Sequence, residues 1–314
     1  MKSIGIIIPC YNEEDVIEVT NTELCNIAIK IKDKFNYSTE LYYVDDGSND
    51  RTSEKLKNIC KNNIIKTNIF ILSRNFGQSA ALTAALDCAL NDAVILIDAD
   101  LQDPPYFIID MIKEWDKGFH MVHARRSSRK GETFLKKLSA KVAYKTINFF
   151  ADINLPANVG DFRLMDKQIV MVLRKLPEKS RYLRGLSNWV GFSSKIIEYS
   201  RDARVAGTTK YNYRNLISLA LLGITSFSNK PLRLSFFLSI FILICCMLLF
   251  IYILGSWING ITIPGWTSLA LIILFMGGIQ LFMISIISEY IAQIFLESKN
   301  RPTYITKDTF SNDI

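Results

Sequence analysis

Two aspartates separated by one residue, Asp98 and Asp100, stand directly after an apolar stretch, and Gln102 and Asp103 follow closely. Carboxylates spaced in this way at the end of a strand can hold a hard cation such as Mg²⁺ or Mn²⁺, which also binds phosphates. Such a cation acts as a Lewis acid on a diphosphate leaving group. The alternative is an ordinary turn, because turns are rich in aspartate. The absence of a basic neighbour favours the metal site.

A second acidic pair, Asp45 and Asp46, precedes a Gly-Ser step. A carboxylate at this position can accept a hydrogen bond from a ribose hydroxyl or a base N–H. The alternative is an Asx turn that caps a helix expected to begin at Thr52. Asp50 and Ser48 can supply that cap, which would leave Asp45 and Asp46 for a ligand.

Other candidate residues have two interpretations each. Pro9, Tyr11 and Glu13 can frame a nucleotide base or cap the next helix. Clusters of basic residues can bind a diphosphate or an anionic acceptor, or form a solvated cationic face near anionic lipid. Asp161 lies in a Gly-Asp-Phe-Arg segment whose residue types predict a turn. The basic set comprises Arg125, Arg126, Arg129, Lys130, Arg201, Arg204 and Lys210.

The elements that must position these residues alternate along the first part of the chain. Near-continuous apolar runs at 4–9, 41–44, 69–72, 93–97 and 121–124 predict strands buried on both faces. Candidate helices lie between them at 14–35, 52–61, 79–90 and 106–117. This order predicts an α/β fold with a mostly parallel sheet. The polar clusters then follow the carboxyl ends of the strands, where such sheets bind ligands.

Composition divides the 314-residue chain into a soluble part and a membrane part. Hydrophobic residues make up 49% and the formal net charge is +7, so wholesale disorder is excluded. Residues 234–288 contain no Asp, Glu, Lys or Arg, which predicts two membrane spans at 234–254 and 266–288. The alternative is two buried helices of a soluble bundle. With two histidines and no CxxC pair, a zinc site is not expected.

Flanking residues predict the orientation of the spans. Lys230 and Arg233 precede the first span, and Lys299 and Arg301 follow the second. The positive-inside rule therefore places both ends of a helical hairpin in the cytoplasm. The N-terminal apolar run is too short for a signal peptide, so the first 230 residues should be cytoplasmic. Residues 133–151 predict a helix that lies on an anionic surface or packs on the sheet, and residues 215–227 predict an interfacial helix.

A series of motifs in a particular order gives the chain a resemblance to a known family. It resembles family 2 glycosyltransferases with the Rossmann-like GT-A fold, and within them the polyprenyl-phosphate enzymes, including bactoprenol glucosyltransferases and dolichol-phosphate mannose synthases. The resemblance covers nearly the whole chain. The motifs are Pro9-Cys10-Tyr11-Asn12-Glu13, Asp45-Asp46-Gly47-Ser48, Arg74-Asn75-Phe76-Gly77, Asp98-Ala99-Asp100-Leu101-Gln102-Asp103-Pro104-Pro105, Gly160-Asp161-Phe162-Arg163, Arg184-Gly185-Leu186 and Arg204-Val205-Ala206-Gly207-Thr208-Thr209-Lys210-Tyr211.

The resemblance implies a role for each motif. Four residues would frame the nucleotide, and Asp98, Asp100 and Gln102 would hold Mg²⁺ or Mn²⁺ with the diphosphate. Asp161 corresponds to a carboxylate proposed as the catalytic base. However, an acceptor phosphate is largely a dianion at neutral pH, so Asp161 can instead orient the acceptor or a basic partner. The nucleotide set is Pro9, Tyr11, Glu13 and Asp46, and the phosphate set is Arg126, Arg204 and Lys210.

The resemblance also implies an activity and a location. We expect transfer of one sugar from a nucleotide sugar, with UDP-glucose as the leading donor, to undecaprenyl phosphate with inversion. GDP-mannose, UDP-aminosugars and UDP-aminoarabinose stay open as donors, and a processive synthase or an inactive membrane scaffold are the alternatives. We expect a GT-A domain at 1–213, an interfacial helix at 214–233, two transmembrane helices at 234–292 and a cytosolic tail at 293–314. The protein would be a multi-pass, homo-oligomeric protein of the bacterial inner membrane with cytoplasmic termini and no nucleic-acid partner.

Overall fold

The computed structural model describes residues 1–126, 159–179, 181–199, 228–259 and 265–312. In these residues the strands form one eight-stranded sheet in the order β7-β5-β6-β4-β1-β2-β3-β8. The predicted helices at 133–151 and 215–227, and the predicted domain boundary at 213, lie outside the described residues.

The first four strands confirm the predicted α/β alternation. β1 pairs in parallel with β2 and β4, and β2 pairs in parallel with β3. Helices connect the strands, and α1 ends where Asn36 takes the left-handed conformation that asparagine tolerates at helix ends. The elements are β1 (Ser3–Cys10), α1 (Ile17–Phe35), β2 (Ser38–Asp45), α2 (Thr52–Asn62), β3 (Lys66–Leu72), α3 (Gln78–Cys88) and β4 (Ala93–Leu96).

The sheet continues with strands of both directions. β6 is antiparallel to β4 and to β5, whereas β5 and β7 are parallel. The prediction of a turn around Asp161 is wrong, because residues 160–163 lie within β6, where Arg163 pairs with Leu96 of β4 and His123 of β5. The remaining elements of this part are η1 (Pro105–Phe107), α4 (Ile108–Asp116), β5 (Met121–Arg126), β6 (Val159–Asp166), α6 (Lys167–Lys175), α7 (Leu183–Trp189) and β7 (Ser194–Tyr199).

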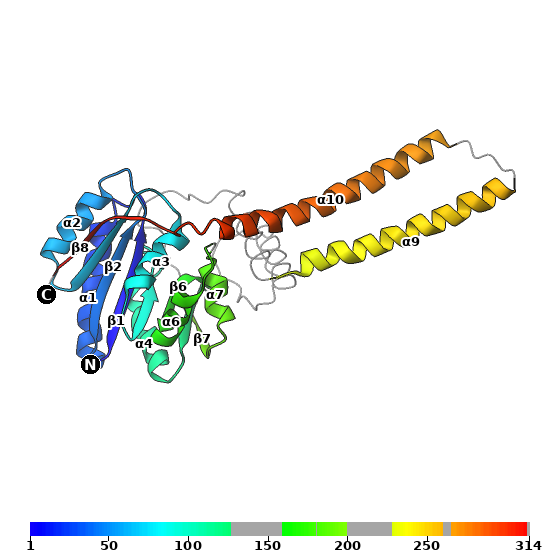
Figure 1. Ribbon diagram of the computed structural model, residues 1–314. Coiled ribbons are helices and arrows are strands. Elements are labelled where there is room, and N and C mark those ends of the chain that lie inside the picture. Colours follow the sequence, from blue (N-terminus) through cyan, green and yellow to red (C-terminus); the bar gives the residue numbers. More distant parts are fainter. Residues whose placement is uncertain (127–158, 180, 200–227, 260–264, 313–314) are drawn as a thin grey trace.

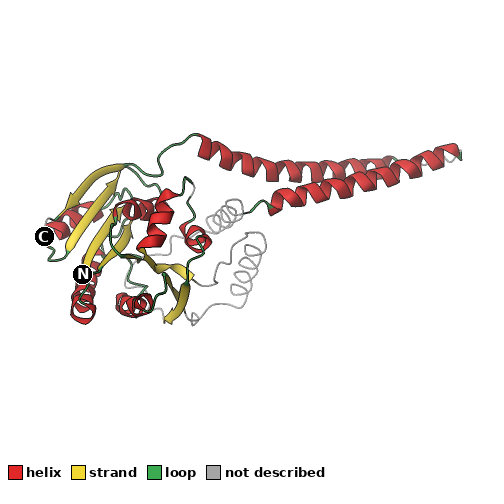
Figure 2. Ribbon diagram, turned by 60° about the horizontal axis from the view of Figure 1, so that its bottom comes forward, coloured by secondary structure: helices red, strands yellow, loops and turns green. Residues whose placement is uncertain are grey.

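Two hydrophobic clusters lie on opposite faces of the sheet. Along β1, Ile4, Ile6 and Ile8 face a cluster with α1, α2 and α4, whereas Ile7 faces a cluster with α3, α6 and α7. All four isoleucines are fully buried, and each contributes about 1.5–3 kcal/mol of burial free energy. Figure 2 shows the strands as a central layer between helices. Burial on both faces explains why these strands read as continuous apolar runs.

Two long helices extend from this body as an arm and lie side by side (Figure 1). They are α9 (Lys230–Ile258) and α10 (Trp266–Ser298). Within the described part of the chain, one segment, Phe275–Ser298, is long and apolar enough to cross a membrane. After α10 the chain returns to the sheet, where β8 (Thr306–Ser311) pairs antiparallel with β3. The sequence predicts no strand in this tail.

Candidate active site

The strand register brings most of the predicted site residues to one edge of the sheet. Cys10 pairs with Asp45 at the ends of β1 and β2, and β4 ends beside β1. β6 runs in the opposite direction, with Arg163 opposite Leu96. β6 therefore begins, from Val159 to Asp161, on the side of the sheet where β4 ends. The loops after β1, β2 and β4 therefore meet the beginning of β6.

Hydrogen bonds join the β1–α1 loop to the β2–α2 loop. The backbone N–H of Asn12 donates to Ser48 Oγ at 2.9 Å, and that of Asn49 donates to Asn12 Oδ1 at 2.9 Å. The N–H of Glu13 donates to Thr52 Oγ1 at 2.9 Å. Pro9, Tyr11 and Glu13 are half-buried in this joined pair of loops. The backbone that carries these candidate nucleotide residues is thus held from the neighbouring loop.

Asp45 and Asp46 both accept hydrogen bonds from within the protein. Asp45 Oδ1 accepts the N–H of Ser48 at 2.9 Å, and Ser53 donates its hydroxyl to the other oxygen. This is the turn interpretation weighed for the pair. Asp50 also accepts the N–H of Thr52 at 3.0 Å and caps α2.

Asp46 reaches the loop after β3. Its two carboxylate oxygens accept the backbone N–H groups of Phe76 at 2.7 Å and Gly77 at 2.9 Å. Burial raises the pKa of Asp46, and these two hydrogen bonds oppose that rise. Asp46 therefore fixes the relative position of two loops at the edge of the sheet, a role that sequence reasoning missed.

The loop from Asp98 to Asp103 contains three carboxylates. Those of Asp98 and Asp100 are half-buried, and that of Asp103 is buried. Asp98 Oδ1 accepts a hydrogen bond from Gln78 Nε2 at 3.0 Å, and Asp100 Oδ1 accepts the N–H of Gln102 at 3.2 Å. Asp103 is fully buried and accepts the hydroxyl of Tyr199. Asp98 and Asp100 thus lie at the edge of the site, whereas Asp103 anchors the loop to β7.

The donor set fits a divalent cation that shares its coordination with a substrate. The described residues contain no group of three or more His, Cys, Asp or Glu side chains placed to hold a metal. Mg²⁺ is commonly bound by one or two carboxylates together with substrate phosphates. Asp98 and Asp100 supply such a pair. The Gln102 side chain is 7% exposed, so the two carboxylates are the more accessible oxygen donors.

Asp161 lies against two arginines. Arg184 of α7 donates to both of its oxygens, from Nε to Oδ1 at 2.8 Å and from Nη2 to Oδ2 at 2.5 Å. Arg163 Nη2 is 3.6 Å from Asp161 Oδ1. Arg163 is buried, donates to Gly160 O and Ser187 Oγ, and has its pKa lowered by burial to about 10. Sequence reasoning included Arg184 in a motif but gave it no role.

The structure describes only some of the basic residues in the predicted phosphate set. β5 ends at the same edge of the sheet, with Arg125 as its next-to-last residue and Arg126 as its last. Arg125 Nη1 is 3.5 Å from Glu198 Oε1. Arg204 and Lys210 lie outside the described residues.

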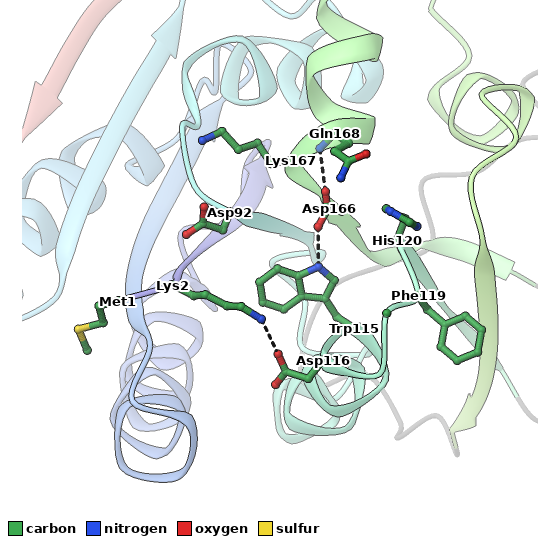
Figure 3. A pocket seen from close by; sticks show the side chains of 11 residues that line it. Met1, Lys2, Asp92, Trp115, Asp116, Phe119, His120, Asp166, Lys167 and Gln168 are labelled. Atoms are coloured by element: carbon green, nitrogen blue, oxygen red, sulfur yellow. Dashed lines mark hydrogen bonds and ion pairs between the residues drawn. The ribbon is translucent and has the colours of Figure 1, made fainter.

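A cavity of about 590 Å³ lies at the opposite edge of the sheet, where β1 and β5 begin and β6 ends. Figure 3 shows contacts between several of its polar residues. Lys2 Nζ is 2.9 Å from Asp116, and Asp166 accepts Trp115 Nε1 at 2.8 Å and the N–H of Gln168 at 2.8 Å. None of the predicted site residues that the structure describes lines this cavity.

Comparison with known proteins identifies the family of the chain. A family model described as Glycosyl transferase family 2 matches residues 5–174, more than half of the chain. The chain belongs to glycosyl transferase family 2. A second model, the GtrB C-terminal hairpin, matches residues 230–294, which contain most of α9 and α10. The chain is therefore a family 2 glycosyltransferase with a GT-A-like fold and a C-terminal helical hairpin.

Relatives of this family 2 enzyme match it over nearly its whole length. It is 41% identical to the uncharacterized glycosyltransferase YkcC of Bacillus subtilis over 309 residues, covering 98% of this chain and 94% of the relative. It is 38% identical to the bactoprenol glucosyl transferase of Shigella phage SfV over 311 residues, covering 97% and 98%. One similar solved structure is glucosyl-3-phosphoglycerate synthase of Mycobacterium tuberculosis in complex with Mn²⁺, UDP-glucose and phosphoglyceric acid. It is 16% identical, with a TM-score of 0.47, and the match covers 71% of this chain and 78% of that chain.

Proposed function

We propose that this glycosyltransferase moves a single sugar from a nucleotide sugar to undecaprenyl phosphate. The observation that carries the proposal is its similarity to bactoprenol glucosyl transferases over both the catalytic part and the hairpin, with 38% identity across 97% of the chain. UDP-glucose is the leading donor, and GDP-mannose, UDP-aminosugars and UDP-aminoarabinose are the other donors to test. The product would be a polyprenyl-phosphate sugar for modification of a cell-surface glycan.

The donor would bind at the loops after β1 and β2. Pro9, Tyr11, Glu13 and Asp46 would frame its nucleotide, supported by the hydrogen bonds that join these loops and by the contact of Asp46 with Gly77. Because most of these bonds use backbone groups, the loops keep their arrangement before the donor arrives. Such preorganisation reduces the ordering cost of binding.

The carboxylates of Asp98 and Asp100, with Gln102, would hold Mg²⁺ or Mn²⁺ with the donor diphosphate. When bound, the cation would offset negative charge on the leaving nucleoside diphosphate. Arg126, Arg204 and Lys210 would contact phosphate groups, since arginine and lysine bind phosphate by charge-assisted hydrogen bonds. Asp98 is further oriented by Gln78 at the start of α3.

Asp161 would orient Arg184 toward the acceptor phosphate. The second pKa of a phosphate monoester is near 6, so the acceptor is largely a dianion at neutral pH and needs no base. The bidentate contact of Asp161 with Arg184 supports an orienting role. The acceptor phosphate oxygen would attack the anomeric carbon directly while the bond to the nucleoside diphosphate breaks, which inverts the configuration.

The hairpin would hold the enzyme at the membrane that contains the lipid acceptor. α9 and α10 have 29 and 33 residues, and at about 1.5 Å per residue they extend over roughly 44 and 50 Å. A bilayer core is about 30 Å thick. Lys230, Arg233, Lys299 and Arg301 lie at the end nearest the catalytic part. We propose a multi-pass, homo-oligomeric protein of the bacterial inner membrane with a cytoplasmic catalytic domain and cytoplasmic termini.

A transfer assay tests this proposal. The purified protein in detergent is incubated with undecaprenyl phosphate, Mg²⁺ or Mn²⁺ and radiolabelled UDP- and GDP-sugars. Label that enters the lipid phase with one donor, and is lost with Asp100→Asn, supports it. A product of retained anomeric configuration would contradict direct inversion. A folded protein that binds no nucleotide sugar would favour the scaffold alternative.

A further inference from the structure

The near end of the hairpin contacts the catalytic part through one carboxylate. Glu297, in the last turn of α10, accepts the backbone N–H of Lys179 with both oxygens, each at 3.0 Å. Glu297 is half-buried at this contact. Lys179 belongs to the connection between α6 and α7. A side chain of the arm therefore holds the backbone of a loop in the catalytic part.

The α6–α7 connection is braced from two further directions. Arg181 donates to the carbonyl oxygens of Glu178 at 3.1 Å and Leu176 at 2.9 Å, which fixes the curvature of the connection. Arg181 Nη1 is also 3.9 Å from Asp87 of α3, which accepts the Tyr304 hydroxyl at 3.0 Å. The end of α10 and the tail that follows it thus converge on one short connection.

This connection leads directly into α7, and α7 carries two groups to the Asp161 strand. Arg184 donates to both oxygens of Asp161, and Ser187 accepts Arg163 Nη1. α7 starts at Leu183, four residues after Lys179. Leu183 and Leu186 of α7 are each 5% exposed and pack in the core. A short helix packed in this way moves as a unit, so its entry point sets the position of the Arg184 guanidinium.

We propose that Glu297 is a positioning residue for sugar transfer: it sets the α6–α7 connection and thereby aligns Arg184 with Asp161. This inference rests on the proposed function, in which Arg184 and Asp161 serve the acceptor phosphate. The arm that holds the enzyme at the lipid surface would then also order the acceptor side of the site. The donor loops after β1 and β2 are held by hydrogen bonds to one another and would be unaffected.

The first test compares Glu297→Ala and Glu297→Gln with Ser298→Ala in the full-length protein. Ser298 is the adjacent exposed residue, and its hydroxyl donates to Phe295 O of its own helix. We expect Glu297→Ala to lower kcat with undecaprenyl phosphate roughly tenfold, because small misplacements of catalytic groups reduce rates strongly. The KM for the nucleotide sugar should stay within about twofold. Glu297→Gln keeps one carbonyl acceptor and should be intermediate, and Ser298→Ala should match the wild type.

The second test measures whether Glu297 acts through Arg184. Lysine at position 184 cannot form the bidentate contact. When Glu297→Ala is added to Arg184→Lys, the further decrease in kcat should be less than about twofold, because the effects of residues in one network are not additive. Full additivity would overturn the proposal, as would unchanged kcat in Glu297→Ala. A parallel loss of nucleotide-sugar affinity would also overturn it, because it would indicate general misfolding.

Hydrogen exchange provides a readout that needs no activity. Glu297→Ala should speed amide exchange in peptides covering α7 and the connection before it, and leave peptides of β1 and β2 unchanged. If wild-type protein transfers no sugar but the exchange pattern appears, the proposed function fails and the physical coupling stands. If the exchange pattern is absent in Glu297→Ala, the coupling itself is refuted.

Discussion

Arg184 and Asp161 form a two-point contact across 23 residues of sequence, with Nε 2.8 Å from Oδ1 and Nη2 2.5 Å from Oδ2. Both oxygens of the carboxylate accept from the same guanidinium. The contact holds the guanidinium of Arg184 in a fixed orientation at the start of β6. This geometry supports the proposal that Asp161 orients Arg184.

Substitution of either partner should have a similar effect. We expect Asp161→Asn and Arg184→Lys each to lower kcat about 100-fold, because each removes the fixed geometry of the pair. The double variant should be little worse than either single variant. Steady-state kinetics with saturating donor measure this. A much larger loss for Asp161→Asn than for Arg184→Lys would instead assign Asp161 a role that does not pass through Arg184.

Asp100 and Asp103 provide a matched pair for the metal proposal. Asp100 is half-buried at the site edge, whereas Asp103 is fully buried and accepts the Tyr199 hydroxyl. Asp100→Asn should leave the melting temperature near the wild-type value and lower transfer at least about 100-fold. Asp103→Asn should lower the free energy of unfolding by about 1–3 kcal/mol, because it weakens a buried hydrogen bond.

The same pair can be followed by metal titration. Chelation by EDTA should abolish transfer by the wild type, and added Mg²⁺ or Mn²⁺ should restore it. Asp100→Asn should require more metal, and Asp103→Asn should keep the wild-type metal dependence in its folded fraction. Equal metal dependence in both variants would remove Asp100 from the metal site.

Gly47 sits where two loops approach closely. Its φ is +67°, and a Cβ at this position would lie 2.4 Å from the carbonyl carbon of Arg74. Gly47→Ala should therefore push the Asp46 loop away from the loop after β3, and lower nucleotide-sugar affinity about tenfold. Gly118 is the control, since it has a φ of +98° but no atom within 4 Å of an added Cβ. Calorimetric binding of UDP-glucose by both alanine variants tests this, and equal affinities would contradict the close-approach argument.

His123 should make the folded state sensitive to acid. It is fully buried on β5 beside Arg163 of β6, and burial, together with the charge of Arg163, lowers its pKa to about 3. The unfolded chain takes up a proton on this histidine below about pH 6.5, whereas the folded chain does not. Stability present above pH 6.5 is therefore lost as the pH falls toward 3, by about 2 kcal/mol at pH 5.

Two variants isolate the contribution of His123. His123→Phe should flatten the dependence of thermal stability on pH between 7 and 5, measured in detergent. His120→Gln should keep the wild-type slope, because His120 is half-exposed and lies at the opposite edge of the sheet. An unchanged slope in His123→Phe would refute the assignment.

The sequence predicted those parts of the fold that leave a pattern of apolar residues within one short stretch of chain. β1 to β5 and the helices between them were found to within a few residues, because strands buried on both faces leave apolar runs. The long helices of the hairpin were also found, and extend several residues beyond the predicted spans. β6 was missed because its Gly-Asp segment reads as a turn, and because its charged Arg163 is buried with partners in β6 and in α7 that no local pattern reveals.

The site was predicted at the level of residues but not of their contacts. The placement of Asp98, Asp100 and Asp46 at one sheet edge follows from parallel topology. The contacts of Asp46 with Gly77, of Asp161 with Arg184 and of Glu297 with Lys179 join segments separated by many residues, and no local pattern encodes them. The roles of Arg126, Arg204 and Lys210 stay predictions.

The return of the chain to the sheet after α10 affects how the protein is made. β8 adds to the edge of β3, and Asn312 accepts the backbone N–H of Thr67. On the ribosome, the first seven strands and both hairpin helices are synthesised before this last strand emerges. Until then the edge of β3 lacks its partner and can pair with another chain. The hairpin is topologically an insertion within the catalytic fold, so exchanging it for another anchor requires two junctions, not a single C-terminal fusion.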